Sequence, residues 1–172
     1  MSLEIIMGGM FSGKSTELIR RVHRHKVIGK RIVVINSSTD TRSSEDVIKT
    51  HDSKCYSCIK VSNLNEIQWR DYDVVAIDEV QFFTGLYDFV EHLLHFGKHI
   101  ILAGLDGDYK QQKFGELFDV IPLADDIIKL HALCMDCKDG TRAPFSKRCS
   151  KSTQQELVGD IDIYKAVCRT CL

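Results

Sequence analysis

Residues 8–15, GGMFSGKS, come directly after a short apolar run and contain Gly8, four further residues, and then Gly13, Lys14 and Ser15. This is the G-x-x-x-x-G-K-[ST] pattern of a phosphate-binding loop. Backbone N–H groups of such a loop converge on phosphate oxygens, aided by the positive end of the following helix. A Gly-rich turn before a helix is the plain alternative, but the complete pattern between a strand and a helix favours the phosphate loop.

The loop predicts a nucleotide site with a magnesium ion. Lys14 would neutralise phosphate charge, and Ser15 would ligate Mg²⁺. The predicted ATP-binding residues are Gly8, Gly9, Met10, Phe11, Ser12, Gly13, Lys14 and Ser15.

Apolar segments alternate with helical patterns over most of the chain. The sequence predicts strands at residues 2–7, 31–35, 73–77 and 98–103, and helices at 15–28 and 84–96. Continuously apolar strands separated by helices predict a parallel sheet covered on both faces, with ligands at the carboxyl ends of the strands. The polar stretch 36–46 has no apolar period, and we interpret it as a mobile surface loop.

The pattern weakens after Pro122, and from Cys134 the chain is rich in Cys, Lys, Ser and Gly. We therefore predict a phosphate-loop α/β domain at 1–130 and a small second unit at 131–172.

Composition narrows the class of protein. The 172 residues are 44% hydrophobic and 27% charged, as in a globular protein with a core, and the net charge is −1. That charge provides no field to gather nucleic acid or an anionic membrane, so a small substrate is favoured. No apolar run reaches the ~20 residues that span a bilayer, and no secretion signal fits before the loop. We expect a cytoplasmic protein without nucleic-acid or membrane partners.

Two carboxylates follow the strand predicted at 73–77, namely Asp78 and Glu79. An acid at this place fits the second magnesium contact of a phosphate-loop enzyme. Because neighbouring residues at a strand end point to opposite sides, Asp78 would face the metal and Glu79 an acceptor hydroxyl, as its base. A hydrolase would use Glu79 to orient water instead, and this stretch leaves both open.

Seven cysteines include two C-x-x-C pairs near the C-terminus, Cys134 with Cys137 and Cys168 with Cys171. Two such pairs predict a tetrahedral structural zinc site, with a redox pair as the rival interpretation. The thirty residues between the pairs exceed the usual ~15–20, so a long excursion must leave the site and return, and it could close over a substrate. Free thiols are expected at Cys55, Cys58 and Cys149.

Aromatic side chains lie in predicted loops or near the cysteine pairs, where a single ring most often only packs. Together they would sandwich a nucleobase. The set is Phe82, Phe83, Tyr109, Phe114 and Tyr164. The histidines have no ligand spacing, and we assign them no role.

These landmarks, in this order, resemble the thymidine kinases of the family that includes vertebrate cytosolic, poxvirus and many bacterial enzymes. The resemblance extends over nearly the whole chain. It rests on GGMFSGKSTELIRR, DTR at 40–42, THD at 50–52, IDEVQFF, LDGDY at 105–109, PLAD, KLHALCMDC, FSKR and VCRTC.

The resemblance implies transfer of the ATP γ-phosphate to the 5′-hydroxyl of thymidine. Glu79 would then be the proton acceptor, and Asp78 would serve the metal. Tyr109, Met10, Phe82 and Phe114 would line the thymine site, and Asp40, Arg42 and Gln81 would support it.

The family also closes a loop between its cysteine pairs, called the lasso, over the base and reads thymine through backbone groups. The base-reading residues would be Gln155, Glu156, Leu157, Val158 and Gly159, with Tyr164 following. A homotetramer and feedback inhibition by thymidine triphosphate are further implications of the resemblance.

Four positions depart from the family pattern. Gly9 replaces a usual Pro, Val80 a usual Gly, Tyr109 a common Phe, and Asp160 a frequent second Gly after the lasso. Gly9 should make the empty loop more flexible, and the Tyr109 hydroxyl could change acceptance of analogues.

Two other classes of function remain alternatives. A zinc-containing ATPase or nucleic-acid-dependent switch would hydrolyse ATP without a nucleoside, but a net charge of −1 argues against it. A protein that only binds nucleotide would not need Lys14, Ser15, Asp78 and Glu79 together.

Overall fold

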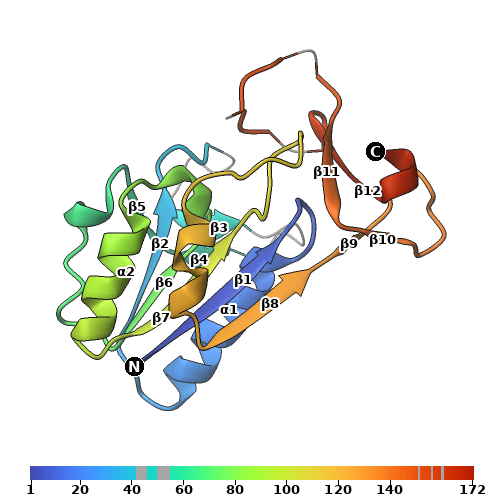
Figure 1. Ribbon diagram of the computed structural model, residues 1–172. Helices are drawn as coiled ribbons and strands as arrows, with labels where there is room; N and C mark the ends of the chain where they lie inside the picture. The colour runs from blue at the N-terminus through green and yellow to red at the C-terminus, as the bar shows by residue number, and fades with distance from the viewer. Residues whose placement is uncertain (42–45, 50–54, 151, 156, 160) are drawn as a thin grey trace.

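A computed structural model describes residues 1–41, 46–49, 55–150, 152–155, 157–159 and 161–172 (Figure 1). Its main body is a six-stranded sheet in the order β5-β2-β6-β7-β1-β8, and every neighbouring pair is parallel. The strands are β1 (Ser2–Gly8), β2 (Ile32–Ser37), β5 (Ile59–Val61), β6 (Val74–Ile77), β7 (His99–Gly104) and β8 (Asp126–Leu130).

Both faces of this sheet are covered, as predicted. β1 alternates between them: Leu3 and Ile5 belong to one buried cluster and Ile6 to another. Helix α1 (Lys14–Val27) adds Leu18 and Val22 to the cluster of Ile6.

Helix α2 (Leu86–His95) covers the other face with Leu86, Phe89, Val90 and Leu93. This i, i+3, i+4, i+7 spacing places all four side chains on one side of the helix. The two helices were predicted to within two residues at each end. No helix in the described ranges is long and apolar enough to cross a membrane.

Shorter elements complete the body. Strands β3 (Val47–Lys49) and β4 (Cys55–Ser57) form an antiparallel pair. The 3₁₀ helices are η1 (Leu64–Glu66), η2 (Val80–Phe82), η3 (Leu117–Leu123) and, at the C-terminal end, η4 (Arg169–Cys171).

The sequence prediction missed both edge strands, β5 and β8. Edge strands are exposed on one side and lack a continuous apolar run; in β8, for example, Ile127 is exposed. The surface-loop interpretation of 36–46 was wrong at its start, because β2 continues through Asn36 and Ser37, which are both buried. Residues 42–45 of that stretch lie outside the described residues.

The C-terminal segment, residues 131–172, forms two small antiparallel pairs beside the carboxyl ends of the main strands (Figure 1). They are β9 (Ala132–Leu133) with β10 (Arg142–Ala143), and β11 (Phe145–Arg148) with β12 (Tyr164–Val167). The lasso is the loop 149–163 that joins β11 to β12. This is the predicted fold class: a phosphate-loop-type parallel sheet flanked by helices, with a small C-terminal region that carries the cysteines and the lasso.

Candidate active site

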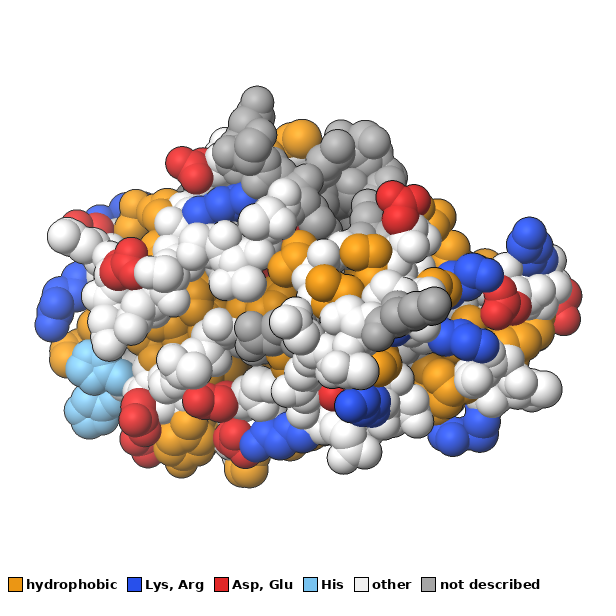
Figure 2. All heavy atoms as spheres, turned by 90° about the horizontal axis from the view of Figure 1, so that it is seen from above, with side chains coloured by type: hydrophobic (Ala, Val, Ile, Leu, Met, Phe, Trp, Pro, Cys, Tyr) orange, Lys and Arg blue, Asp and Glu red, His pale blue; other side chains and the backbone are white. Residues whose placement is uncertain are grey.

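A pocket opens at the carboxyl ends of the main strands, where ligands of parallel α/β sheets usually bind. Five parts of the chain line it: the phosphate loop with the start of α1, the segment after β2, the segment after β6, the segment after β7, and the C-terminal segment. Figure 2 looks down on this end of the molecule and shows apolar side chains in the middle, with Lys and Arg side chains toward the C-terminal segment.

The phosphate loop has the backbone shape that its glycines predict. Gly8 has φ 151°, and a Cβ there would lie 2.3 Å from the Leu130 carbonyl oxygen, so only glycine fits. Gly13 has φ 86° and precedes α1 without a capping side chain from any described residue. The first-turn N–H groups and the helix dipole therefore make this end of α1 suited to a phosphate.

Residues from Met10 to Ser15 line the pocket, whereas Gly8 and Gly9 shape the loop behind it. The buried ammonium of Lys14 donates to the Gly9 carbonyl at 2.8 Å, as does the Ser12 hydroxyl at 2.8 Å. These bonds hold the loop in a closed turn with a cation at its centre.

Asp78 and Glu79 differ in placement for a reason that the sequence did not reveal. β6 ends at Ile77, so strand alternation, the basis of the prediction, does not apply to them. Glu79 instead adopts a left-handed conformation, φ 51° and ψ 43°. Glu79 lines the pocket, while Asp78 is buried behind it and accepts the Glu79 N–H at 3.0 Å. Such a conformation costs about 1–3 kcal/mol in a non-glycine residue and is concentrated at functional sites.

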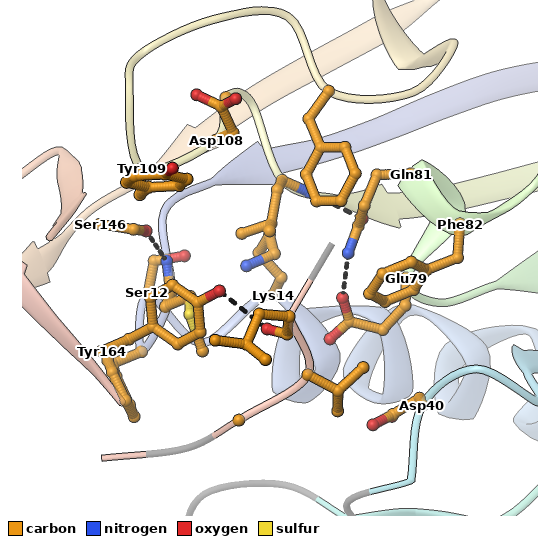
Figure 3. A pocket seen from close by; sticks show the side chains of 18 of the residues that line it. Ser12, Lys14, Asp40, Glu79, Gln81, Phe82, Asp108, Tyr109, Ser146 and Tyr164 are labelled. Carbon is orange, nitrogen blue, oxygen red and sulfur yellow. Dashed lines mark hydrogen bonds between the residues drawn. The ribbon is translucent and has the colours of Figure 1, made fainter. Parts of the chain in front are cut away.

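Gln81 holds the Glu79 carboxylate (Figure 3). Its amide nitrogen donates to that carboxylate, and its amide oxygen accepts the Leu105 N–H at 3.0 Å. Gln81 is buried and therefore links the carboxylate to the backbone after β7. The supporting role that the resemblance implies for Gln81 stays a prediction.

Asp40 also lines the pocket and is buried. Its carboxylate accepts the Asn36 side-chain N–H at 3.0 Å, and the Lys60 ammonium donates to its carbonyl at 3.0 Å. Arg42, its predicted companion, lies outside the described residues.

Four of the five predicted aromatic residues reach the pocket. Figure 3 shows Tyr109 and Tyr164 on one side and Phe82 on the other. The Phe82 ring stands at 90° to the Phe114 ring, with centroids 5.8 Å apart. Phe83 is the exception, because it packs in the core on the α2 face.

The lasso contributes Gln155, Leu157, Val158 and Gly159 to the pocket lining. The Gln155 side chain donates to the Asp108 carboxylate at 2.8 Å and to the Lys113 carbonyl at 3.1 Å. Glu156 and Asp160 lie outside the described residues.

Sequence reasoning gave no role to several further lining residues, among them Asp108, Ser146 and Arg148. The Ser146 hydroxyl accepts the Met10 N–H at 2.9 Å, which connects the phosphate loop to β11. Ser146 and Arg148 belong to the FSKR motif and Asp108 to LDGDY, so the motifs were visible although their contacts were not.

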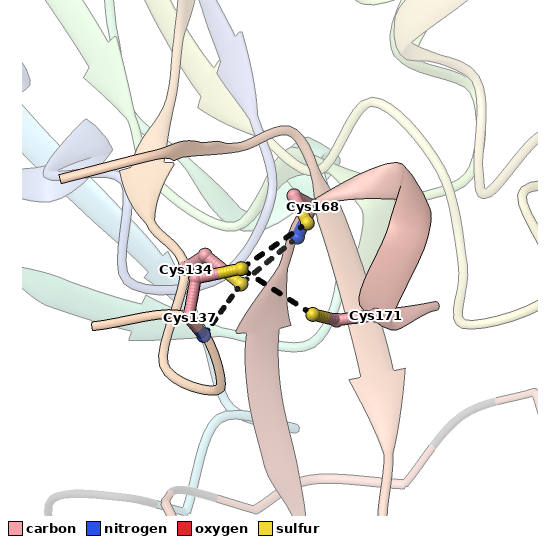
Figure 4. Close-up of side chains that lie close together, drawn as sticks. All are labelled: Cys134, Cys137, Cys168 and Cys171. Atoms are coloured by element: carbon pink, nitrogen blue, oxygen red, sulfur yellow. Dashed lines mark hydrogen bonds between the residues drawn. The ribbon is translucent and has the colours of Figure 1, made fainter. Parts of the chain in front are cut away.

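The sulfurs of Cys134, Cys137, Cys168 and Cys171 all lie within 4.8 Å of one another (Figure 4). The Cys137 sulfur is 3.7 Å from that of Cys168 and 3.5 Å from that of Cys171. A tetrahedral zinc with ~2.3 Å bonds needs sulfurs about 3.8 Å apart, so this cluster fits zinc.

Backbone amides support the thiolate form at one corner of this cluster. The N–H groups of Cys137 and Cys168 donate to the Cys134 sulfur at 3.5 and 3.3 Å. The Cys137 amide above all lowers the pKa of the Cys134 thiol to about 6. Cys55, Cys58 and Cys149 are free thiols, as predicted, and burial raises the pKa of Cys58 to about 11.

Fold and site together define a phosphate-loop α/β protein whose nucleotide loop and buried carboxylate share one pocket with an aromatic cage. The family model described as thymidine kinase matches residues 1–172. The chain belongs to the thymidine kinase family.

Relatives agree with this membership. The thymidine kinase of Variola virus is 40% identical over 171 residues, which cover 98% of this chain and 95% of the relative. Thymidine kinase of Myxoma virus (strain Uriarra) is 40% identical over 98% of this chain and 94% of its own. Thymidine kinase 1 of Dictyostelium discoideum is 42% identical over 98% of this chain and 76% of its own length.

Proposed function

We propose that this protein transfers the γ-phosphate of ATP to the 5′-hydroxyl of thymidine, giving thymidine monophosphate. The observation that carries the proposal is the single pocket lined by the phosphate loop, Glu79 and the aromatic cage. A kinase needs donor and acceptor in one water-poor space, in line for transfer.

At the donor end, the loop from Gly8 to Ser15 binds the ATP phosphates. Lys14 neutralises charge on the transferred group. Ser15 and Asp78 would hold Mg²⁺, which would neutralise charge on the phosphate oxygens.

At the acceptor end, Glu79 takes the proton of the 5′-hydroxyl as that oxygen attacks phosphorus. Gln81 keeps one carboxylate oxygen engaged and so fixes the direction of the other. The rings of Phe82, Phe114 and Tyr109, which belong to the body of the protein, pack against the thymine. Asp40 and Arg42 support the site.

The lasso covers the remaining side of the base, with Met10 and Tyr164 beside it. Backbone groups of 155–159 read the thymine edge. The four clustered cysteines hold a structural Zn²⁺ that anchors both ends of this region. We divide the chain accordingly into a kinase domain at 1–130 and a zinc-binding and lasso unit at 131–172.

We further propose a homotetramer in the cytoplasm, or in the host cytoplasm for a viral source. Feedback inhibition by thymidine triphosphate is expected, with its base in the acceptor site and its phosphates reaching toward the donor loop. Size-exclusion chromatography with light scattering tests the tetramer, and a competition assay against thymidine tests the inhibition.

The function is tested by ATP consumption with Mg²⁺, with and without thymidine, and with each other deoxynucleoside in turn. Thymidine-dependent consumption that yields thymidine monophosphate supports the proposal, and Lys14→Ala should abolish it. ATP consumption that is the same with and without nucleosides would overturn the kinase assignment in favour of an ATPase.

A further inference from the structure

The FSKR motif ends in Arg148, a residue for which neither the phosphate chemistry nor the cysteine cluster provides a role. Arg148 is the last residue of β11 and pairs in register with Tyr164, the first residue of β12. These two residues therefore form the neck from which the lasso, 149–163, departs and to which it returns.

The Arg148 guanidinium donates hydrogen bonds to three backbone carbonyls of the lasso. One terminal nitrogen donates to Gln154 and, at 3.3 Å, to Ser152. The other donates to Gln155 at 3.0 Å. Hydrogen bonds from a charged donor are stronger than neutral ones, so this fork fixes the path of residues 152–155.

Two tyrosines bracket the same guanidinium. Its central carbon lies 3.8 Å from the centre of the Tyr109 ring, which belongs to the body of the protein. Arg148 also donates to the Tyr164 hydroxyl at 2.5 Å, and that hydroxyl donates to the Leu157 carbonyl at 2.7 Å. Arg148 thus connects Tyr109 of the body with the lasso, directly at residues 152–155 and through the Tyr164 hydroxyl at Leu157.

A second contact between body and lasso lies alongside. The Tyr109 hydroxyl donates to the Thr153 carbonyl at 3.1 Å. Phe is common at this position in the family that the sequence resembles, and a Phe side chain would lack this contact.

We propose that Arg148 is the positioning residue that holds the lasso over the acceptor nucleoside, and that the Tyr109 hydroxyl strengthens this hold. The inference rests on the proposed function and adds the residue that sets the nucleoside affinity of that pocket. Arginine suits the role because its planar fork can bond several carbonyls and stack on a ring at once, whereas lysine is a point charge.

The test is Arg148→Met, which keeps an unbranched stem and removes every donor. We expect the KM for thymidine to rise about tenfold or more, with the KM for ATP unchanged and kcat changed less. Arg148→Lys should fall between wild type and Arg148→Met. Arg142→Met is the matched control, since Arg142 is an exposed arginine of β10 outside the pocket lining.

Hydrogen–deuterium exchange measures how firmly the lasso is held, and it does not require enzymatic activity. Arg148→Met should exchange faster in the 149–163 peptide, while peptides of β1 and β7 keep wild-type rates. Tyr109→Phe leaves the ring under the guanidinium and should raise the thymidine KM only a few-fold.

An unchanged thymidine KM together with unchanged lasso exchange in Arg148→Met would overturn the inference. Equal rises of the thymidine and ATP KM values would also overturn it, because they indicate general damage. If wild-type turnover does not require thymidine, the proposed function fails by itself, and the exchange measurement still decides whether Arg148 holds the lasso.

Discussion

The body of the protein and its C-terminal segment meet at one pocket but are held together by different forces. Among the described residues, the body buries apolar clusters of 21 and 10 side chains, whereas the C-terminal segment buries one of only six, two of them cysteines. Apolar burial contributes roughly 25 cal/mol per Å², so it stabilises the body much more than the C-terminal segment. The structure of the C-terminal segment depends instead on its four clustered cysteines and on the polar contacts that its lasso makes.

This difference teaches how the work is divided. A deeply buried sheet can keep a strained residue such as Glu79 in place, which suits the chemical step. The C-terminal segment of 42 residues has only a small core, and in the proposed function its lasso covers the nucleoside. Changes in the body should therefore appear in kcat and in global stability, and changes in the segment should appear in the KM for thymidine.

Glu79→Gln should have the largest effect and tests the body's half of this division. The substitution keeps the shape and removes the base, so we expect kcat to fall about 10²–10⁴-fold while ATP and thymidine still bind. Steady-state kinetics and calorimetric titration with each substrate measure the two parts. Glu91→Gln, on the exposed side of α2, is the matched control. Unchanged turnover would remove Glu79 from the mechanism.

Cys168→Ser should have the next largest effect and tests the segment. Loss of one of four thiolates should remove the zinc and loosen the lasso, which raises the KM for thymidine about tenfold while ATP binding is kept. Zinc content by atomic emission and the two KM values check this. Cys149→Ser, at an exposed free thiol in the same segment, should change neither. Full zinc in Cys168→Ser would refute the four-thiolate site.

Glu4→Gln should have the smallest effect and tests the stability of the body alone. Glu4 lies in β1 beside Arg21 and His99, whose Nε2 atom is 3.0 Å from the Glu4 carboxylate; the contact with His99 first, and then the hydrogen bond from Arg21, lower the pKa of Glu4 to about 2. Because the folded-state pKa lies below the unfolded one, the ionised carboxylate stabilises the fold above about pH 4.5, and this stability is lost as the pH falls toward 2.

Removing that carboxylate should cost on the order of 1–3 kcal/mol at pH 7 and flatten the acid limb of the unfolding curve. Urea unfolding at pH 7 and pH 3 measures it. Glu91→Gln should stay within about 0.5 kcal/mol of wild type at pH 7. An equal cost at both pH values would show that Glu4 acts by packing rather than by charge.

Local patterns were predictable from the sequence because they are set by contiguous residues. The phosphate loop needs Gly8 and Gly13 because their backbone angles are unfavourable for other residues. The shape of the loop can therefore be predicted from its sequence. The cysteine pairs have the same character, since a C-x-x-C turn brings two sulfurs to one side by itself. The structure brings the four cysteines of the two pairs together.

Features that depend on distant partners were not predictable in this way. The left-handed turn at Glu79 leaves no mark in IDEVQFF, and β8 is identified as a strand only by its pairing with β1. Arg148 forms its contacts with Tyr109 and with carbonyls across the lasso, and backbone carbonyls have no sequence signature. Such contacts require the assembled fold.

The pairing of β1 with β8 has a consequence for anyone who redesigns this protein. Gly8 stands opposite Leu130, and from that rung one strand runs into the phosphate loop while the other reaches β9 after a single residue, His131. The phosphate loop and the C-terminal segment therefore both continue from this one pair of residues, which fixes their relative position. Lengthening the chain at His131 would move the C-terminal segment relative to the phosphate loop, and so would change the proposed site without replacing any residue that lines the pocket.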